Sequence, residues 1–247
     1  MDSRRVLVTG SSRGIGRAIA VRLAADGWRV ALHYVEDRAK AENVVESLGD
    51  RVAGCYRANL AEPAAGDRLV AEALSEGPLH AVVNNAGVYL QTNFIEAGDG
   101  EFEATLRKTL AVNFESPLRI ARAAAKHFAA TGGGSILNVA SRVGFRGEPG
   151  ASLYAASKAA LINLTRSLAV ELAPRNVLLF GIAPGWVDTS MARAGMNDRL
   201  PNILRDIPIG RMASPEDCAA VVSFLLSPDA AYLSGVVIDI NGASYFH

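Results

Sequence analysis

Along most of the chain, short runs of apolar residues alternate with longer segments in which apolar residues recur at helical spacing. The first run, Val6-Leu7-Val8, is typical of a buried parallel strand, and one apolar stripe follows it from Ile15 to Leu23. The same pattern predicts strands over 5–8, 28–34, 52–58, 79–84, 135–140, 177–182 and 236–240, and helices near 14–26, 37–48, 63–75, 101–129, 152–173 and 215–226.

This alternation predicts an α/β fold in which a doubly wound, seven-stranded parallel sheet carries helices on both faces. The first three strands should wind to one side and the later strands to the other, which leaves a ligand crevice at the switch point. No internal repeat, low-complexity segment or linker divides the chain, and 247 residues suffice for one large core. We therefore expect a single domain over residues 1–247.

The least regular stretch covers residues 186–214, and we call it the lid segment. It follows the carboxyl end of a predicted strand, where ligands bind in open α/β sheets. It combines apolar residues such as Trp186, Met191 and Met196 with a possible hinge at Gly195. We expect a mobile lid that closes over substrate; the alternative is an ordinary surface excursion.

Composition narrows the class of protein. Half of the residues are hydrophobic and the formal net charge is zero, so charge does not favour nucleic acid or an anionic membrane as a partner. No apolar run approaches membrane-spanning length, and the first residues run directly into a strand without room for a signal peptide. Cys55 and Cys218 do not suggest a disulfide framework or a metal cluster, and the histidines show no ligand spacing. We expect a cytoplasmic enzyme without a metal.

The segment Thr9–Gly16, called the glycine turn below, has the sequence TGSSRGIG and lies between the first strand and the first helix. Strand, glycine-rich turn and helix form the context that a dinucleotide-phosphate site requires. Glycines allow the backbone to approach a pyrophosphate, and the helix N-terminus offers free N–H groups to the anion. The alternative is an ordinary strand-to-helix turn, which also favours glycine.

Tyr154 and Lys158 are four residues apart and project from one face of a predicted helix. A lysine charge beside a phenol favours the phenolate, so we expect Lys158 to bring the tyrosine pKa toward neutrality. Such a pair can donate and accept a proton during interconversion of a carbonyl and an alcohol. Alone, the same spacing also suits a packed ring and a solvated charge.

Together with four further motifs, these features resemble the classical short-chain dehydrogenase/reductase family from Val6 to about Gly242. The glycine turn fits that family's T-G-x-x-x-G-x-G pattern, and Ser141 precedes Tyr154 by the usual 13 residues. The other matches are Asn84-Asn85-Ala86-Gly87, Asn113 and Pro184-Gly185-Trp186-Val187-Asp188-Thr189. The resemblance implies a single-domain Rossmann fold, an NAD(P)(H)-dependent oxidoreductase that interconverts a carbonyl and a secondary alcohol, and a homotetramer.

The resemblance also implies the roles of the site residues. Ser141 would position the substrate oxygen, Tyr154 would donate the proton, and Lys158 would bind the nicotinamide ribose. Asn113 would hold a water that renews the proton, and Pro117, four residues later, would leave the Asn113 carbonyl free for it. The expected cofactor-binding residues are Gly10, Ser12, Arg13, Gly14, Ile15, Gly16, His33, Tyr34, Asn59, Leu60, Asn85, Ala86, Gly87, Tyr154, Lys158, Pro184, Gly185, Val187 and Thr189.

Cofactor choice depends on the end of the second strand. An acidic residue there would bind the adenosine ribose of NAD, but His33 and Tyr34 occupy the position. Arg13 can pair with a 2′-phosphate, so we predict NADP(H) rather than NAD(H). Glu36 follows closely, and a small shift in register would favour NAD instead.

The substrate is not fixed by the fold. Residues 208–211 and 238–242 resemble 3-oxoacyl-[acyl-carrier-protein] reductases, which implies an acyl thioester or another small carbonyl substrate and makes acyl carrier protein a candidate partner. Two positions depart from that subgroup: Thr131-Gly132-Gly133-Gly134 stands where basic residues are common, and Asn59 stands where an aspartate is usual. An NAD-dependent sugar or secondary-alcohol dehydrogenase, and a non-catalytic dinucleotide-binding regulator, remain alternatives.

Overall fold

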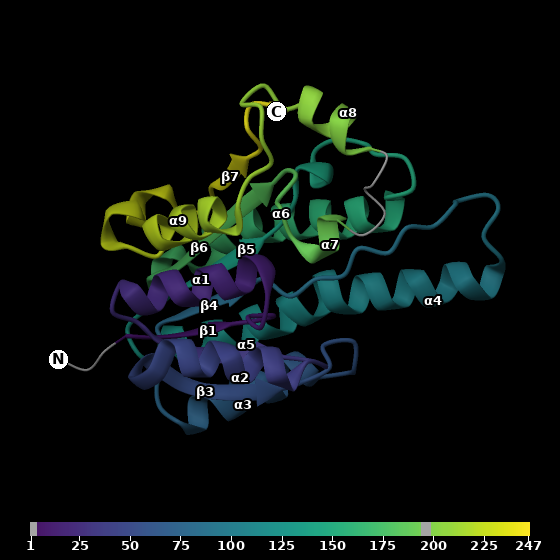
Figure 1. Ribbon diagram of the computed structural model, residues 1–247. Helices are drawn as coiled ribbons and strands as arrows, with labels where there is room; N and C mark the ends of the chain where they lie inside the picture. The colour runs from purple at the N-terminus through teal and green to yellow at the C-terminus, as the bar shows by residue number, and fades with distance from the viewer. Residues whose placement is uncertain (1–3, 194–198) are drawn as a thin grey trace.

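The computed structural model describes residues 4–193 and 199–247, whose core is a seven-stranded parallel sheet in the order β3-β2-β1-β4-β5-β6-β7 (Figure 1). The strands are β1 (Arg5–Val8), β2 (Arg29–Tyr34), β3 (Val52–Arg57), β4 (Ala81–Asn84), β5 (Gly134–Val139), β6 (Val177–Pro184) and β7 (Val237–Ile240). The chain starts at the centre, winds outward to β3, returns to β4 beside β1 and then winds the other way to β7. The predicted doubly wound α/β fold is confirmed, with its switch point between β1 and β4.

Helices cover both faces of the sheet. On one face α1 (Gly14–Ala25), α2 (Arg38–Leu48) and α9 (Pro215–Leu225) pack on alternate strand residues such as Val6 and Val8. On the other face α3 (Ala65–Ser75), α5 (Ser116–Ala130) and α6 (Ser152–Leu172) pack on Leu7 and its neighbours. Because both faces are covered, the central strands are mostly apolar and buried, and each fully buried branched side chain contributes roughly 1.5–3 kcal/mol.

The predicted helix over 101–129 is in fact three segments. These are α4 (Asp99–Leu110), a π-helical turn over Ala111–Glu115 and α5. The π-helical turn carries Asn113, and Pro117 lies in the first turn of α5, where proline is tolerated. A single π-helical turn often marks a functional site, because it changes the direction of one side chain within a continuous helix.

The lid segment is more regular than its sequence indicates. It contains the short helices α7 (Ser190–Arg193) and α8 (Leu200–Arg205), and a parallel bridge joins Val187 to Ala213 near its two ends. The predicted hinge Gly195 and the predicted anchor Met196 lie outside the described residues. Short 3₁₀ helices occur at Gly49–Arg51, Arg142–Gly144, Ala173–Arg175 and Pro228–Leu233. Within the described residues, none of the helices is long and apolar enough to cross a membrane.

Candidate active site

The glycine turn is shaped by close packing as well as by backbone conformation. Gly10 has φ +65°, in the left-handed region that favours glycine. A Cβ on Gly16 would lie 2.2 Å from the carbonyl oxygen of Gly10, so α1 can approach the turn only with glycine there. The helix starts at Gly14 and no side chain caps it. Its first N–H groups are therefore available to an anion, which fits a pyrophosphate.

The loop after β4 is fastened to this turn. Asn85 Nδ2 donates to the carbonyl oxygens of Thr9 and Gly10 at 2.8 and 3.2 Å. The backbone N–H groups of Asn85 and Ala86 both donate to Thr9 Oγ1, at 2.9 and 3.0 Å. The Asn85 side chain thus joins the loop after β4 to the glycine turn.

Asn113 is fully buried and is held by two elements. Its Oδ1 accepts from the Val88 N–H at 2.8 Å, and its Nδ2 donates to the Val88 carbonyl at 2.9 Å and to Ser157 Oγ at 3.2 Å. A Cβ on Gly87 would lie 3.3 Å from Asn113 Oδ1 and 3.6 Å from Lys158 Nζ. Asn113, Gly87 and Lys158 therefore surround one point at the carboxyl end of β4.

Lys158 is buried and its Nζ donates to the Val139 carbonyl at 2.8 Å, 5.7 Å from the centre of the Tyr154 ring. Burial lowers the pKa of Lys158 to about 8 and raises the pKa of Tyr154 to about 12. A hydrogen bond with Ser141 acts on the Tyr154 pKa in the opposite direction, with a smaller effect. The predicted lowering of the tyrosine pKa is wrong, because burial of the phenol raises its pKa instead. A protonated phenol at neutral pH suits a proton donor.

Ser141 lies two residues after the end of β5 and caps the 3₁₀ turn Arg142–Gly144, with the Val143 N–H 3.4 Å from its Oγ. Its hydroxyl and that of Tyr154 share a hydrogen bond. The sheet and α6 therefore bring together a serine hydroxyl, a protonated phenol and a buried ammonium. This arrangement can bind a carbonyl oxygen and deliver a proton to it.

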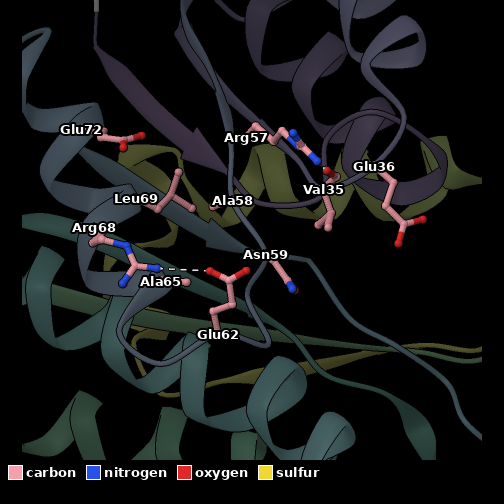
Figure 2. Close-up of a pocket in the computed structure, with 10 residues that line it drawn as sticks. All are labelled: Val35, Glu36, Arg57, Ala58, Asn59, Glu62, Ala65, Arg68, Leu69 and Glu72. Carbon is pink, nitrogen blue, oxygen red and sulfur yellow. Dashed lines mark hydrogen bonds and ion pairs between the residues drawn. The ribbon is translucent and has the colours of Figure 1, made fainter.

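Of the four residues predicted to contact the adenosine, two are buried and two are at least partly exposed. The His33 side chain has no exposed surface and Leu60 is buried, whereas Tyr34 is partly exposed and Asn59 is exposed. A cavity of about 510 Å³ lies beside Asn59, at the ends of β2 and β3. Its lining is Val35, Glu36, Arg57, Ala58, Asn59, Glu62, Ala65, Arg68, Leu69 and Glu72. Figure 2 shows Glu62 and Arg68 directed toward each other across this cavity, with 3.5 Å between their charged atoms.

The predicted nicotinamide contacts follow β6. Pro184 is the last residue of β6, and the Gly185 N–H donates to the Ile240 carbonyl at 2.9 Å. Val187 is buried, and Thr189 comes so close to the glycine turn that a Cβ on Gly14 would lie 3.3 Å from its methyl carbon. The lid segment thus begins beside the start of α1.

Arg13 extends from the glycine turn toward the lid segment. Its Nη1 donates to Ser190 Oγ at 3.0 Å in an exposed contact. Its charge also helps to lower the pKa of Asp37 at the start of α2, after the larger effect of Lys40. The guanidinium therefore lies between the lid segment and the residues that follow β2.

Several polar residues that support the site were not predicted. Buried Asn84 and Asn138 are joined across β4 and β5 by an Asn84 Nδ2 to Asn138 Oδ1 hydrogen bond of 2.9 Å. Asn138 Nδ2 then donates to Thr165 Oγ1 on α6 at 2.9 Å. Asparagines inside predicted buried strands were the available signal, because buried polar groups require partners.

Comparisons with known proteins agree with this geometry. A family model described as Enoyl-(Acyl carrier protein) reductase matches residues 10–243. The chain is 34% identical over 246 residues to the 3-oxoacyl-[acyl-carrier-protein] reductase FabG of Staphylococcus aureus (strain Mu50 / ATCC 700699), with 98% of both chains covered.

Solved structures give the same result. A blue fluorescent protein from a metagenomic library in complex with NADPH has a TM-score of 0.90 and 33% identity, over 98% of both chains. A Serratia marcescens short-chain dehydrogenase/reductase mutant has a TM-score of 0.88 and 34% identity, over 98% of this chain and 97% of that one. A 3-ketoacyl-(acyl-carrier-protein) reductase from Brucella melitensis complexed with NADH has a TM-score of 0.87 and 31% identity, over 98% of both chains.

Proposed function

The chain belongs to the short-chain dehydrogenase/reductase family, and on this premise we propose that it is an NADPH-dependent ketoreductase of the 3-oxoacyl-[acyl-carrier-protein] reductase type. Membership makes it an oxidoreductase of CH–OH groups that uses a nicotinamide dinucleotide. The observation that carries the proposal is the grouping of Ser141, Tyr154 and Lys158 at the carboxyl edge of the sheet.

Each of these side chains has a proposed task. The Ser141 and Tyr154 hydroxyls bind the substrate carbonyl oxygen, and the Tyr154 phenol gives its proton to that oxygen as negative charge develops there. After the proton transfer, the positive charge of Lys158 stabilises the tyrosinate of Tyr154. Asn113 lies near Lys158 and would help to hold a water through which Tyr154 regains its proton. A bound nicotinamide dinucleotide supplies the hydride.

We propose that the glycine turn and the loops after β2, β3, β4 and β6 hold this dinucleotide. Arg13 would pair with a 2′-phosphate, which favours NADPH. The open first turn of α1 and the absence of side chains at Gly10 and Gly14 support this placement. The site of substrate selection would be the lid segment, which begins beside the predicted nicotinamide position.

The acyl-thioester substrate is proposed because two of the similar proteins are a 3-oxoacyl- and a 3-ketoacyl-(acyl-carrier-protein) reductase. By the same resemblance, acyl carrier protein is the proposed partner and a homotetramer the proposed assembly. In the tetramer, α4, α5 and α6 would form one interface and the β7 region the other. Light scattering at micromolar protein should then give about four times the mass of one chain, and a monomeric mass would contradict the assembly.

A substrate panel tests the proposed activity. Acyl thioesters, quinones, small diketones, sugars and steroids are each supplied with NADPH and with NADH, sugars and simple secondary alcohols are supplied in parallel with NADP+ and NAD+, and the oxidation or reduction of the dinucleotide is followed. We expect fastest turnover of a 3-oxoacyl thioester with NADPH. Preference for a sugar or a simple secondary alcohol with NAD would establish the alternative dehydrogenase, and no turnover despite dinucleotide binding would indicate a regulator.

A further inference from the structure

The imidazole of His33 joins two loops at the cofactor side of the sheet. His33 is the next-to-last residue of β2 and has no exposed surface. The Gly10 N–H donates to its Nδ1 at 3.0 Å, and its Nε2 lies 2.9 Å from the Ala58 carbonyl oxygen. Gly10 belongs to the glycine turn, and Ala58 immediately precedes Asn59. One buried side chain therefore links the proposed pyrophosphate loop to the proposed adenosine loop.

The two partners determine the protonation state of the ring. A backbone N–H can only donate, so Nδ1 must accept from Gly10 and carry no proton. A backbone carbonyl can only accept, so Nε2 must carry the proton and donate it to Ala58. Burial lowers the pKa of His33, against a smaller opposite effect of the bond to Ala58, and so favours the same neutral form.

Neighbouring backbone contacts strengthen the link between β2 and the glycine turn. The Ser11 N–H donates to the His33 carbonyl at 2.9 Å, and the His33 N–H donates to Ser11 Oγ at 2.9 Å. Consecutive residues of the turn, Gly10 and Ser11, are thus bound to the same residue of β2. Gly10 is also the residue with φ +65°, so the His33 bond acts on the point where the turn reverses direction.

We propose that His33 is a positioning residue for dinucleotide binding. Through Nδ1 it holds the Gly10 N–H, and with it the glycine turn, in the shape that receives a pyrophosphate, without touching the cofactor. A turn that is already ordered loses less conformational freedom on binding, so affinity rises. The inference rests on the proposed function, because it presupposes that the dinucleotide binds at this turn.

Two substitutions separate the two bonds of the ring. The amide oxygen of His33→Asn can occupy the place of Nδ1 and keep the acceptor for Gly10, but this side chain is too short to reach Ala58. The longer His33→Gln can place its amide near the position of Nε2 and keep the Ala58 bond, but leaves the Gly10 N–H without a partner.

We expect the NADPH dissociation constant to rise about tenfold in His33→Gln and to stay within about threefold of the original in His33→Asn, with kcat at saturating NADPH unchanged in both. His127→Asn is the matched control. It removes a 3.1 Å hydrogen bond to the carbonyl of Leu79, which lies before the amino end of β4, at the end of the strands opposite the glycine turn. Equal NADPH affinity in His33→Gln and the unchanged protein, or equal losses in His33→Gln and His33→Asn, would overturn the proposal.

Amide hydrogen exchange gives an answer even if a variant fails to fold. In the unchanged protein without dinucleotide, the Gly10 amide should exchange as slowly as the amides of β1. Fast exchange at Gly10 beside slow exchange in β1 would show that His33 does not hold the turn. If the protein binds neither NADPH nor NADH, the proposed function fails, whereas this exchange result still decides whether His33 fixes Gly10.

Discussion

The glycine turn and the lid segment lie at the same edge of the sheet, but they are held in different ways. Gly10 is held by two hydrogen bonds: its N–H donates to His33 Nδ1, and its carbonyl accepts from Asn85 Nδ2. His33 belongs to β2 and Asn85 directly follows β4. Breaking a bond between groups that are shielded from water costs free energy, because the groups left behind are unpaired.

The lid segment has a small apolar cluster of its own. Ile203 and Ile207 are buried against Trp186, whereas Met191 and Leu200 are 41% and 38% exposed. Its described contacts with the glycine turn include the exposed bond from Arg13 to Ser190. From this comparison we predict that the proposed cofactor side is formed before binding and that the lid segment changes its packing more easily than the glycine turn.

The largest expected effect comes from Tyr154, which lies on α6 and not in the lid segment. Tyr154→Phe removes the proposed proton donor and keeps the ring that packs edge-on against Tyr89 at 5.0 Å. Turnover should fall at least ~10²-fold while NADPH affinity and melting temperature change little. Stopped-flow absorbance and dinucleotide titration measure the two quantities. Tyr89→Phe, which also removes one phenol, should stay within a few-fold of the original turnover; a similar loss in both variants would argue against a special role of Tyr154.

The pH dependence tests the buried ammonium of Lys158. Its pKa of about 8 lies below the ordinary lysine value of 10.5, so the unfolded chain binds more protons between these values. The contribution of Lys158 to stability should therefore rise with pH from about 8 to 10.5, against the opposite contributions of Tyr154 and Cys218, whose pKa values burial raises to about 12. Reduction should slow as pH rises above about 8 because the charge of Lys158 is lost. Lys158→Met should make the slope of stability against pH less positive over this range, and the exposed Lys126→Met should leave that slope as it is. Denaturant unfolding at several pH values measures this, and an unchanged slope in Lys158→Met would contradict the assignment.

Arg13 tests the contact between the two regions. Arg13→Ala should weaken NADPH about tenfold and leave NADH nearly unchanged, since only the former carries the 2′-phosphate. Arg17→Ala, an exposed arginine one turn later on α1, should leave both affinities as they are. Ser190→Ala shows whether the bond to the lid segment matters by itself. Tighter binding of NADH than NADPH by the unchanged protein would refute the predicted preference.

The smallest effect is expected in the lid segment. Met191→Ala should change the order of preferred ketones a few-fold and leave NADPH affinity intact, since Met191 is half-exposed and outside the sheet. Val21→Ala, on the exposed surface of α1 and outside the proposed interfaces, is the control. Parallel losses for all ketones in Met191→Ala would mean that the residue supports the fold and does not select substrate.

The sequence alone predicted the winding of the sheet, which the structure confirms, and supplied the catalytic candidates, but it did not predict three features of the site. Apolar runs and the spacing of motifs are set by residues that are close together in the chain, so they can be read directly from the sequence. The π-helical turn at Asn113 leaves the helical pattern almost unchanged, so one long helix was predicted. The pKa of Tyr154 depends on burial by distant segments. The hydrogen bonds of the His33 ring reach residues 23 and 25 positions away, to a backbone N–H and a carbonyl that carry no side-chain signal.

The central claim is that this protein transfers hydride from a nicotinamide dinucleotide to a ketone carbon while Tyr154 supplies the proton. The most direct measurement uses NADPH deuterated on the transferred C4 position with the best ketone of the panel, and mass spectrometry of the product. The account predicts one deuterium on the carbinol carbon of the alcohol, and almost no product with Tyr154→Phe. An alcohol formed without deuterium, or equal product with Tyr154→Phe, would contradict it.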